Sequence, residues 1–311
     1  MPTKDEELWS KIYAYQDQFN KFIEKKANDS KMVLVLDTLL VVDVYQAMAL
    51  VLAPKCPEDF KAQVDALKSI LDRIFDYLHS ASYDKETDEK LNNEILARMD
   101  RFFEFLAWCA GLEVKIPDNA DQPMGKGCKM NFIIAKPLPQ VPVPPSPPSP
   151  KAIEQAQELA KAIETYHSQL IEYILQKANR DIFIPVALMG FETAYLYNAL
   201  GVLLMSLCPW FFTGEDLEST AEIIKHMVST VNSAYDAKRP KEEVMAEIAL
   251  RAQEYIVWRE GFLMRMAWCY DIDMDVEFIP KGNGMEITIM RYEPAPPQAP
   301  PPQGSLGAPA N

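Results

Sequence analysis

The sequence predicts a mainly α-helical protein with an internal duplication of a module of about four helices, each copy followed by a short β-hairpin. Apolar residues recur at helical spacing over most of the chain, and the second half repeats the first. Each repeat ends in a short alternating stretch and a proline run. With 311 residues, 49% of them hydrophobic, the chain is long enough to fill two sizeable cores.

The repeat is found by comparing the chain with itself. A shift of 151 residues aligns the first predicted helices, 152 aligns the second and 160 aligns the fourth. The matched pairs include Leu8 with Leu159, Ile12 with Ile163, Tyr45 with Tyr197, Cys56-Pro57 with Cys208-Pro209, and Ala107-Trp108-Cys109 with Ala267-Trp268-Cys269. The residues that the two copies share are those that pack cores and end helices. The copies share no polar set of the kind a catalytic site needs. We therefore expect two like modules that pack on each other about a pseudo-twofold axis.

The first copy begins with an amphipathic helix that carries Leu8, Ile12 and Phe19 at helical spacing, and Asn28 can adopt the left-handed conformation that ends it. The second helix is apolar nearly all round, which predicts the buried central helix of a bundle. The period then changes to strand alternation. The predicted elements are helices at Asp5–Lys26, Met32–Ala53, Glu58–Ser80 and Asp84–Ala110, and strands at Leu112–Ile116 and Met130–Ala135.

The second copy repeats this plan, with Asn179 in the place of Asn28. The turn Lys281-Gly-Asn-Gly284 is a strong hairpin signal. The predicted elements are helices at Lys151–Lys177, Asp181–Leu207, Gly214–Ala234 and Pro240–Tyr270, and strands at Met274–Ile279 and Met285–Arg291.

The two proline runs set the predicted domain boundaries. We expect a first helical module with its hairpin at 1–136, a linker at 137–150, a second module with its hairpin at 151–293, and a disordered tail at 294–311. A straight polyproline II linker would hold its ends about 40 Å apart. The runs are interpreted as an inert spacer and a tail, or else as ligands for an aromatic groove.

Composition limits the classes of partner. The formal net charge of −14 disfavours bulk nucleic-acid binding. The charged N-terminus is unlike a secretory signal, which predicts a cytoplasmic location. Two apolar stretches, Met32–Ala53 and Ile182–Phe212, invite a membrane interpretation, but Asp37, Asp43 and Glu192 lie within them. An Asp at the bilayer centre costs about 2.5–3.5 kcal/mol, so no membrane span is expected.

The five cysteines follow the repeat, except for Cys128. In an up-down bundle the C-terminal ends of the second and fourth helices lie together, so Cys56 with Cys109 and Cys208 with Cys269 are candidate disulfides. Buried thiols are the alternative interpretation. Zinc is not expected, because the sequence has no Cys-x-x-Cys motif and no paired histidines.

Two acidic patterns on predicted helices are candidate metal sites. Glu242, Glu243 and Glu247 partly resemble the metal-binding helix of all-α nucleotide pyrophosphatases, which implies Mg²⁺ on a triphosphate, but the second acidic motif of that family is missing. Glu164-x-x-His167 fits the pattern of carboxylate di-iron bundles, whereas the first copy has Tyr13 and Gln16 there. We therefore expect no catalytic residue, metal or cofactor.

Three carboxylates in the apolar helices receive an ordinary interpretation. Asp37 and Asp43 align with Met189 and Tyr195 in the repeat, so no site shared by the copies is expected, and these side chains are predicted to reach solvent or a lysine. A polar site inside the bundle is the alternative. Trp210, Phe211 and Phe212 occur only in the second copy and predict either a partner patch or a cap on the bundle end.

These observations favour a non-enzymatic scaffold or adaptor, built as a tandem pseudo-dimer of helical modules, that binds a protein partner. The first alternative is an all-α, Mg-dependent nucleotide pyrophosphohydrolase. The second is a membrane-associated protein that uses the apolar second helix of each copy.

Overall fold

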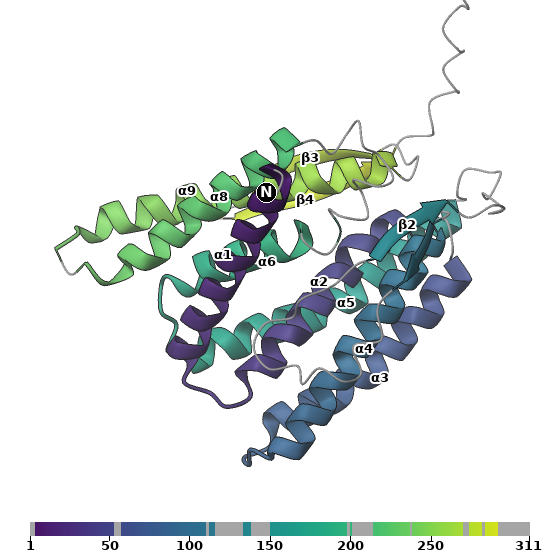
Figure 1. Cartoon of the computed structure of the whole chain (residues 1–311), viewed down its shortest axis with the longest axis horizontal. Helices are drawn as coiled ribbons and strands as arrows, with labels where there is room; N and C mark the ends of the chain where they lie inside the picture. The colour runs from purple at the N-terminus through teal and green to yellow at the C-terminus, as the bar shows by residue number, and fades with distance from the viewer. Residues whose placement is uncertain are drawn as a thin grey trace, which may run out of the picture.

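The computed structural model describes residues 4–52, 57–109, 112–115, 133–137, 150–197, 200, 214–236, 238–269, 274–281 and 284–291, and in these the protein is mainly helical (Figure 1). Four helices precede the proline-rich linker: α1 (Lys4–Ala27), α2 (Met32–Leu52), α3 (Pro57–His79) and α4 (Lys85–Cys109). Those described after it are α5 (Pro150–Lys177), α6 (Ile184–Leu196), α8 (Gly214–Asn232) and α9 (Lys241–Cys269), with a 3₁₀ turn, η2 (Ser233–Tyr235), between α8 and α9.

Two antiparallel strand pairs follow the helices. Strand β1 (Leu112–Lys115) pairs with β2 (Ile133–Pro137), with Leu112 opposite Pro137 and an irregularity between Glu113 and Lys115. Strand β3 (Met274–Lys281) pairs with β4 (Gly284–Arg291), from Met274 opposite Arg291 to Lys281 opposite Gly284. Strand β1 contacts the end of α4, and β3 contacts α9.

The helix ends follow local chemistry. Asn28 and Asn179 have positive φ angles of 46° and 52°, which confirms the predicted left-handed ends of α1 and α5. The turns that follow are alike. Asp29 Oδ1 accepts the backbone N–H of Lys31 at 2.9 Å, and Asp181 Oδ1 accepts that of Phe183 at 3.0 Å. Each aspartate thereby satisfies one of the free N–H groups at the start of the next helix.

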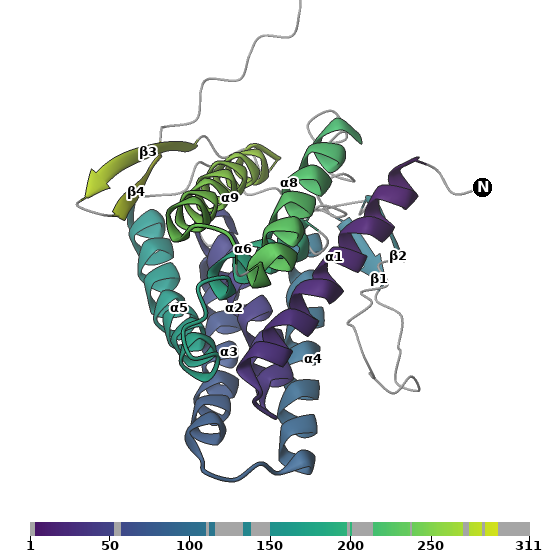
Figure 2. The same cartoon turned by 90° about the vertical axis from the view of Figure 1, so that its left-hand side faces the viewer.

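The helices form two groups, and each group mixes helices from both sides of the linker. In the first, which we call the α2 group, α5 packs along α2 and α3 while α2 also contacts α4. In the second, the α6 group, α1 packs along α6 and α8 while α6 also contacts α9. Figures 1 and 2 show α2, α3, α4 and α5 together on one side and α1, α6, α8 and α9 on the other. The helices α1 and α5 thus each leave their neighbours in sequence and join the other half.

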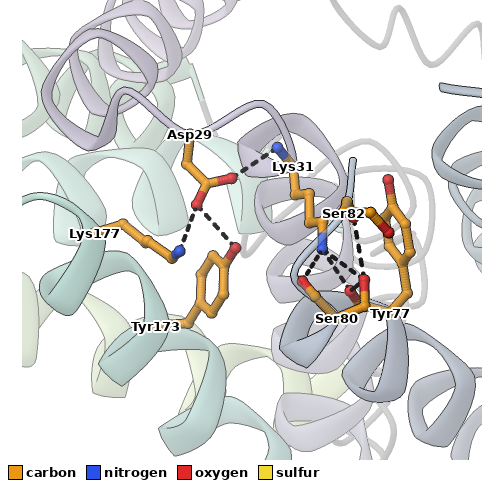
Figure 3. A network of polar contacts seen from close by, with 7 residues as sticks. All are labelled: Asp29, Lys31, Tyr77, Ser80, Ser82, Tyr173 and Lys177. Carbon is orange, nitrogen blue, oxygen red and sulfur yellow. Dashed lines mark hydrogen bonds and ion pairs between the residues drawn. The ribbon is translucent and has the colours of Figure 1, made fainter. Parts of the chain in front are cut away.

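Two ion pairs fasten these exchanged helices. Lys26, near the end of α1, lies 2.6 Å from Asp181 before α6. Lys177, at the end of α5, lies 3.1 Å from Asp29 before α2. The Tyr173 hydroxyl adds a hydrogen bond to Asp29 at 3.0 Å (Figure 3). Each pair joins a helix end to the turn that starts the central helix of the other half.

A second part of the same network ties α2 to α3. Lys31 is buried, and its ammonium donates to the Tyr77 carbonyl at 2.6 Å and to the Ser80 carbonyl at 2.9 Å (Figure 3). Burial lowers the pKa of Lys31. The carbonyl groups at the end of α3 therefore gain a cationic donor, which is the favourable charge for a helix C-terminus.

Helix α2 is the central helix of its group. In the described part of the chain it is the helix that is long and apolar enough to cross a membrane, and 83% of Met32–Ala49 is buried inside the fold. Tyr45 stacks on Phe102 of α4 with ring centroids 3.7 Å apart. An apolar helix that packs on several neighbours is typical of the centre of a helical bundle.

Glycine is required at one crossing of the exchanged helices. A Cβ atom at Gly190 of α6 would overlap with the ring of Phe19, a fully buried residue of α1. The missing side chain lets the aromatic ring lie directly on the helix backbone. Helix α1 is therefore seated on α6 by a specific fit as well as by apolar burial.

Candidate functional site

The site lies where the two helix groups meet and takes residues from four helices. His167 of α5 places Nε2 2.8 Å from Oδ1 of Asp43 on α2 and 3.5 Å from Oε1 of Glu192 on α6. The hydroxyl of Tyr255 on α9 donates a hydrogen bond to Oε2 of Glu192. Arg259, one turn further along α9, adds a positive charge that acts on both carboxylates. We call these five residues the junction cluster.

The junction cluster is shielded from water. The side chains of Asp43 and Glu192 are 3% and 6% exposed, and that of His167 is 15% exposed. Asp43 and Glu192 lie within the two most apolar helices, where burial of a charge is costly unless it is compensated. The imidazole between them supplies that compensation, which explains how two carboxylates persist in this core.

The electrostatics favour a protonated histidine. Burial acts to lower the pKa of His167, but the charges of Asp43 and Glu192 outweigh it and raise that pKa to about 10. Burial and the charge of Glu192 raise the pKa of Asp43 to about 6. Burial acts to raise the pKa of Glu192, but His167 and Arg259 lower it below its ordinary value. Two cations and two anions therefore balance near neutral pH.

The hydrogen-bonding capacity of the cluster is only partly used. Neither carboxylate oxygen of Asp43 accepts a hydrogen bond from any residue that the structure describes, and His167 Nε2 donates none within the same ranges. The 2.8 Å approach of His167 to Asp43 is thus a charge contact whose N–H direction misses the oxygen. These atoms retain coordination or hydrogen-bonding capacity for a further group.

The ligand atoms could hold one metal ion. One imidazole nitrogen and one oxygen from each of two carboxylates lie within 4.8 Å of one another. The two carboxylates and the imidazole are ordinary ligands of divalent transition metals. Tyr255 would then hold a ligand carboxylate in place from outside, as groups around metal ligands commonly do.

Sequence reasoning considered Asp43, Glu192 and His167 but did not bring them together. The prediction that buried carboxylates in the apolar helices reach solvent or a lysine does not describe Asp43 or Glu192, because both face His167. The available signal was that all three break the repeat with ionisable residues: Asp43 and Glu192 align with Tyr195 and Leu40, and His167 aligns with the uncharged Gln16. Asp37 lies elsewhere on α2, and burial raises its pKa to about 7 against the opposing effect of Asn92.

The other predicted metal candidates have different surroundings. Glu242 and Glu243 are exposed in the first turn of α9. Glu247 accepts hydrogen bonds from Thr230 at 2.6 Å and from Arg239 at 2.5 Å, which lower its pKa although burial opposes them. Glu164 is exposed, whereas His167 three residues later turns into the junction cluster. The three acidic residues of α9 therefore do not converge on one point as the cluster does.

Several predicted site residues lie outside the described ranges or depend on residues that do. Trp210, Phe211 and Phe212 are among these, as are Cys56 and Cys208. The suggested pairs Cys56–Cys109 and Cys208–Cys269 therefore stay predictions, as does the aromatic patch.

A second feature of interest is the outer face of α9. Four apolar side chains on this helix are well exposed, with exposed fractions of 48% for Met245, 48% for Leu250, 63% for Val257 and 42% for Met264. Leu250, Val257 and Met264 are spaced seven residues apart, so they form a stripe along one side of the helix. We call these three residues the α9 stripe, whereas Met245 lies on another side of the helix. Such a stripe is typical of a surface that packs against another helix.

Known proteins supply no further guide, because no protein-family model, curated protein or solved structure matches the chain.

Proposed function

We propose that the protein is a non-enzymatic scaffold or adaptor, a tandem pseudo-dimer of two duplicated helical modules with their hairpins, that presents α9 to a protein partner. The α9 stripe carries this proposal. Its side chains are apolar and well exposed along about four turns, which is unusual for a helix face that binds nothing. Figure 1 shows α8 and α9 projecting from the body as a pair, so the stripe lies on an accessible element.

The junction cluster supports a structural use of the interior. Its charged groups are shielded from water and balance one another, and they join four helices from both groups. A substrate would need access that this burial restricts. The interlocked body is therefore well suited to hold α9 in a fixed orientation, while recognition takes place outside.

The pattern of the stripe indicates the type of partner. Seven-residue spacing matches the seam along which two helices pack, so we expect an amphipathic helix whose apolar face covers Leu250, Val257 and Met264. The net charge of −14 makes a basic polar face on that helix favourable at the rim.

The test uses the intact protein and two matched variants. Val257→Lys places a charge in the centre of the stripe, whereas Ile182→Lys makes the same change at another exposed apolar site, 46% exposed, before α6. We expect cross-linking in the source cells to capture a stoichiometric partner with the wild type and with Ile182→Lys, but not with Val257→Lys. Deletion of 294–311 reports separately on the proline-rich tail. If both lysine variants captured the partner equally well, α9 would not be the docking face.

The two alternative functions each have a direct test. Hydrolysis of nucleotides in the presence of Mg²⁺ that requires Glu242, Glu243 and Glu247 would support the pyrophosphohydrolase, although Glu247 already binds Arg239 and Thr230. Recovery with membranes that needs detergent to reverse it would support the membrane-associated protein.

A further inference from the structure

We infer that Asp43, His167 and Glu192 bind one divalent first-row transition-metal ion at the junction of the two helix groups. This inference goes beyond the scaffold function and does not depend on it. The ion would be coordinated by His167 Nε2 and by one oxygen from each carboxylate. It would therefore link α2 and α5 of one group to α6 of the other.

The spacing of the ligand atoms fits such an ion. Zinc lies about 2.0–2.2 Å from nitrogen and oxygen ligands, so two ligands at tetrahedral or octahedral angles are about 2.8–3.6 Å apart. His167 Nε2 is 2.8 Å from Asp43 Oδ1 and 3.5 Å from Glu192 Oε1, and all three ligand atoms lie within 4.8 Å of one another. The two distances from His167 fall in this range, and the carboxylate oxygens of Asp43 and Glu192, at most 4.8 Å apart, would close to the same range on the bound ion.

The unused hydrogen-bonding capacity is an independent observation. Asp43 is 97% buried as a side chain, since its exposed fraction is 3%, yet its carboxylate accepts no hydrogen bond from the described residues. His167 Nε2 lies 2.8 Å from Asp43 Oδ1, yet its N–H direction does not complete a hydrogen bond between them. A shared cation would satisfy these atoms together, which a direct histidine–aspartate hydrogen bond does not.

The surrounding residues narrow the type of ion. One imidazole and two carboxylates suit zinc, manganese, iron(II) or cobalt, whereas Ca²⁺ and Mg²⁺ prefer oxygen ligands alone. Binding would release the proton from His167 Nε2, and the ion together with Arg259 would leave no negative charge of the two carboxylates for a second cation. Tyr255 holds Glu192 through its second oxygen, Oε2, which leaves Oε1 toward His167.

The sequence repeat fixes the expected stoichiometry. The positions aligned with His167, Asp43 and Glu192 are Gln16, Tyr195 and Leu40, which do not form a set of metal ligands. A chain of two repeats would therefore bind one ion and not two.

The experiment measures binding of Co²⁺, Zn²⁺ and Mn²⁺, each alone, to the full-length protein after removal of metals with a chelator. We expect one ion per chain, a higher melting temperature on binding, and visible absorption from bound Co²⁺. Glu192→Gln and His167→Gln are expected to abolish saturable binding. Tyr255→Phe is expected to weaken it about 10–100-fold, as loss of a supporting group does. Glu158→Gln removes an exposed carboxylate from α5, the helix that carries His167, and should leave binding unchanged.

A second variant keeps the test decisive even if the cluster substitutions do not fold. The chain has three histidines, and His79 and His226 lie outside the cluster. In His79→Gln/His226→Gln, His167 is the remaining imidazole, so pulsed electron paramagnetic resonance of bound Mn²⁺ should show coupling to one ¹⁴N nucleus. No saturable binding to the folded wild type, or bound Mn²⁺ without that coupling, would overturn the inference. The cluster would then be a salt-bridge centre held together by the proton on His167.

Discussion

His167 on α5 and Gln16 on α1 align when the chain is shifted by 151 residues, and both helices pack on the other half of the molecule, yet the chemistry around them differs. His167 faces two buried carboxylates. The residues aligned with Asp43, Glu192 and Arg259 are Tyr195, Leu40 and Met99, and the Tyr195 hydroxyl donates to the Met99 sulfur. One crossing is thus highly charged, and its counterpart is mostly apolar.

The ends of the same helices show the opposite pattern. Lys26 with Asp181 and Lys177 with Asp29 are ion pairs at positions that the repeat aligns with each other. Residues that agree between the repeats therefore fasten the exchanged helices. Residues that disagree give the α5 crossing a chemistry of its own, which is where a specific role is best sought.

The largest expected difference between the two crossings comes from removal of the central polar residue. In metal-free protein, His167→Leu leaves Asp43 and Glu192 without the cation between them, and breaking a buried ion pair in this way costs about 3–5 kcal/mol. Gln16→Leu removes an uncharged group and is expected to cost about 1 kcal/mol. Urea denaturation of both variants measures the difference, and equal costs would show that the charges at the α5 crossing contribute no extra stability.

The pH dependence of stability should separate the crossings next. The pKa of His167 is raised to about 10 in the folded state from an ordinary value of 6.5. Its contribution is therefore fully present below pH 6.5 and is lost as pH rises toward 10. Metal-free wild type should lose stability over that range. The His167→Gln variant should lose less, and an identical pH profile for both would contradict a protonated His167.

Two glycines test how closely α1 is seated. Gly190→Ala puts a methyl group against the Phe19 ring, and overpacking of this kind costs about 1–3 kcal/mol. Gly261 is also within a helix but has nothing within 4 Å of an added Cβ, so Gly261→Ala should be neutral or stabilise by up to about 1 kcal/mol. Thermal denaturation compares the stability of the two variants. A Gly190→Ala variant as stable as the wild type would contradict the position of the Phe19 ring against α6.

The smallest effects are expected at the matching ion pairs. Lys26→Met and Lys177→Met each remove a partly exposed pair, which is worth up to about 1 kcal/mol. Lys177→Met should cost less, because the Lys177 side chain is 43% exposed against 19% for Lys26, and Asp29 keeps its hydrogen bond from Tyr173. A larger loss for Lys177→Met would contradict this ranking.

Much of the helical architecture could be predicted from the sequence because helices and their ends are local. The apolar spacing of α1 and the helix-ending positions Asn28 and Asn179 need only neighbouring residues. The exchange of α1 and α5 could not be predicted. Helices α1 and α5 have similar apolar faces, so either one could cover α2 or α6 with a similar free energy of packing. The apolar periodicity of the sequence therefore does not distinguish the two arrangements.

The junction cluster was hidden for a related reason. Its members lie on four helices, and Asp43 and Tyr255 are separated by more than two hundred residues. The residues that the two aligned halves share lie elsewhere, and this cluster consists of residues that they do not share. An exception to a repeat at a buried position was the informative signal.

The exchange of the first helices is tested most directly by cutting the chain. Residues 1–143 and 144–311 would be produced together as separate polypeptides, divided within the proline-rich linker, and examined by native mass spectrometry. Since α1 packs on α6 and α5 packs on α2, we predict a stable one-to-one complex of the two fragments. Two fragments that each fold as a separate monomer and do not combine on mixing would contradict the exchange.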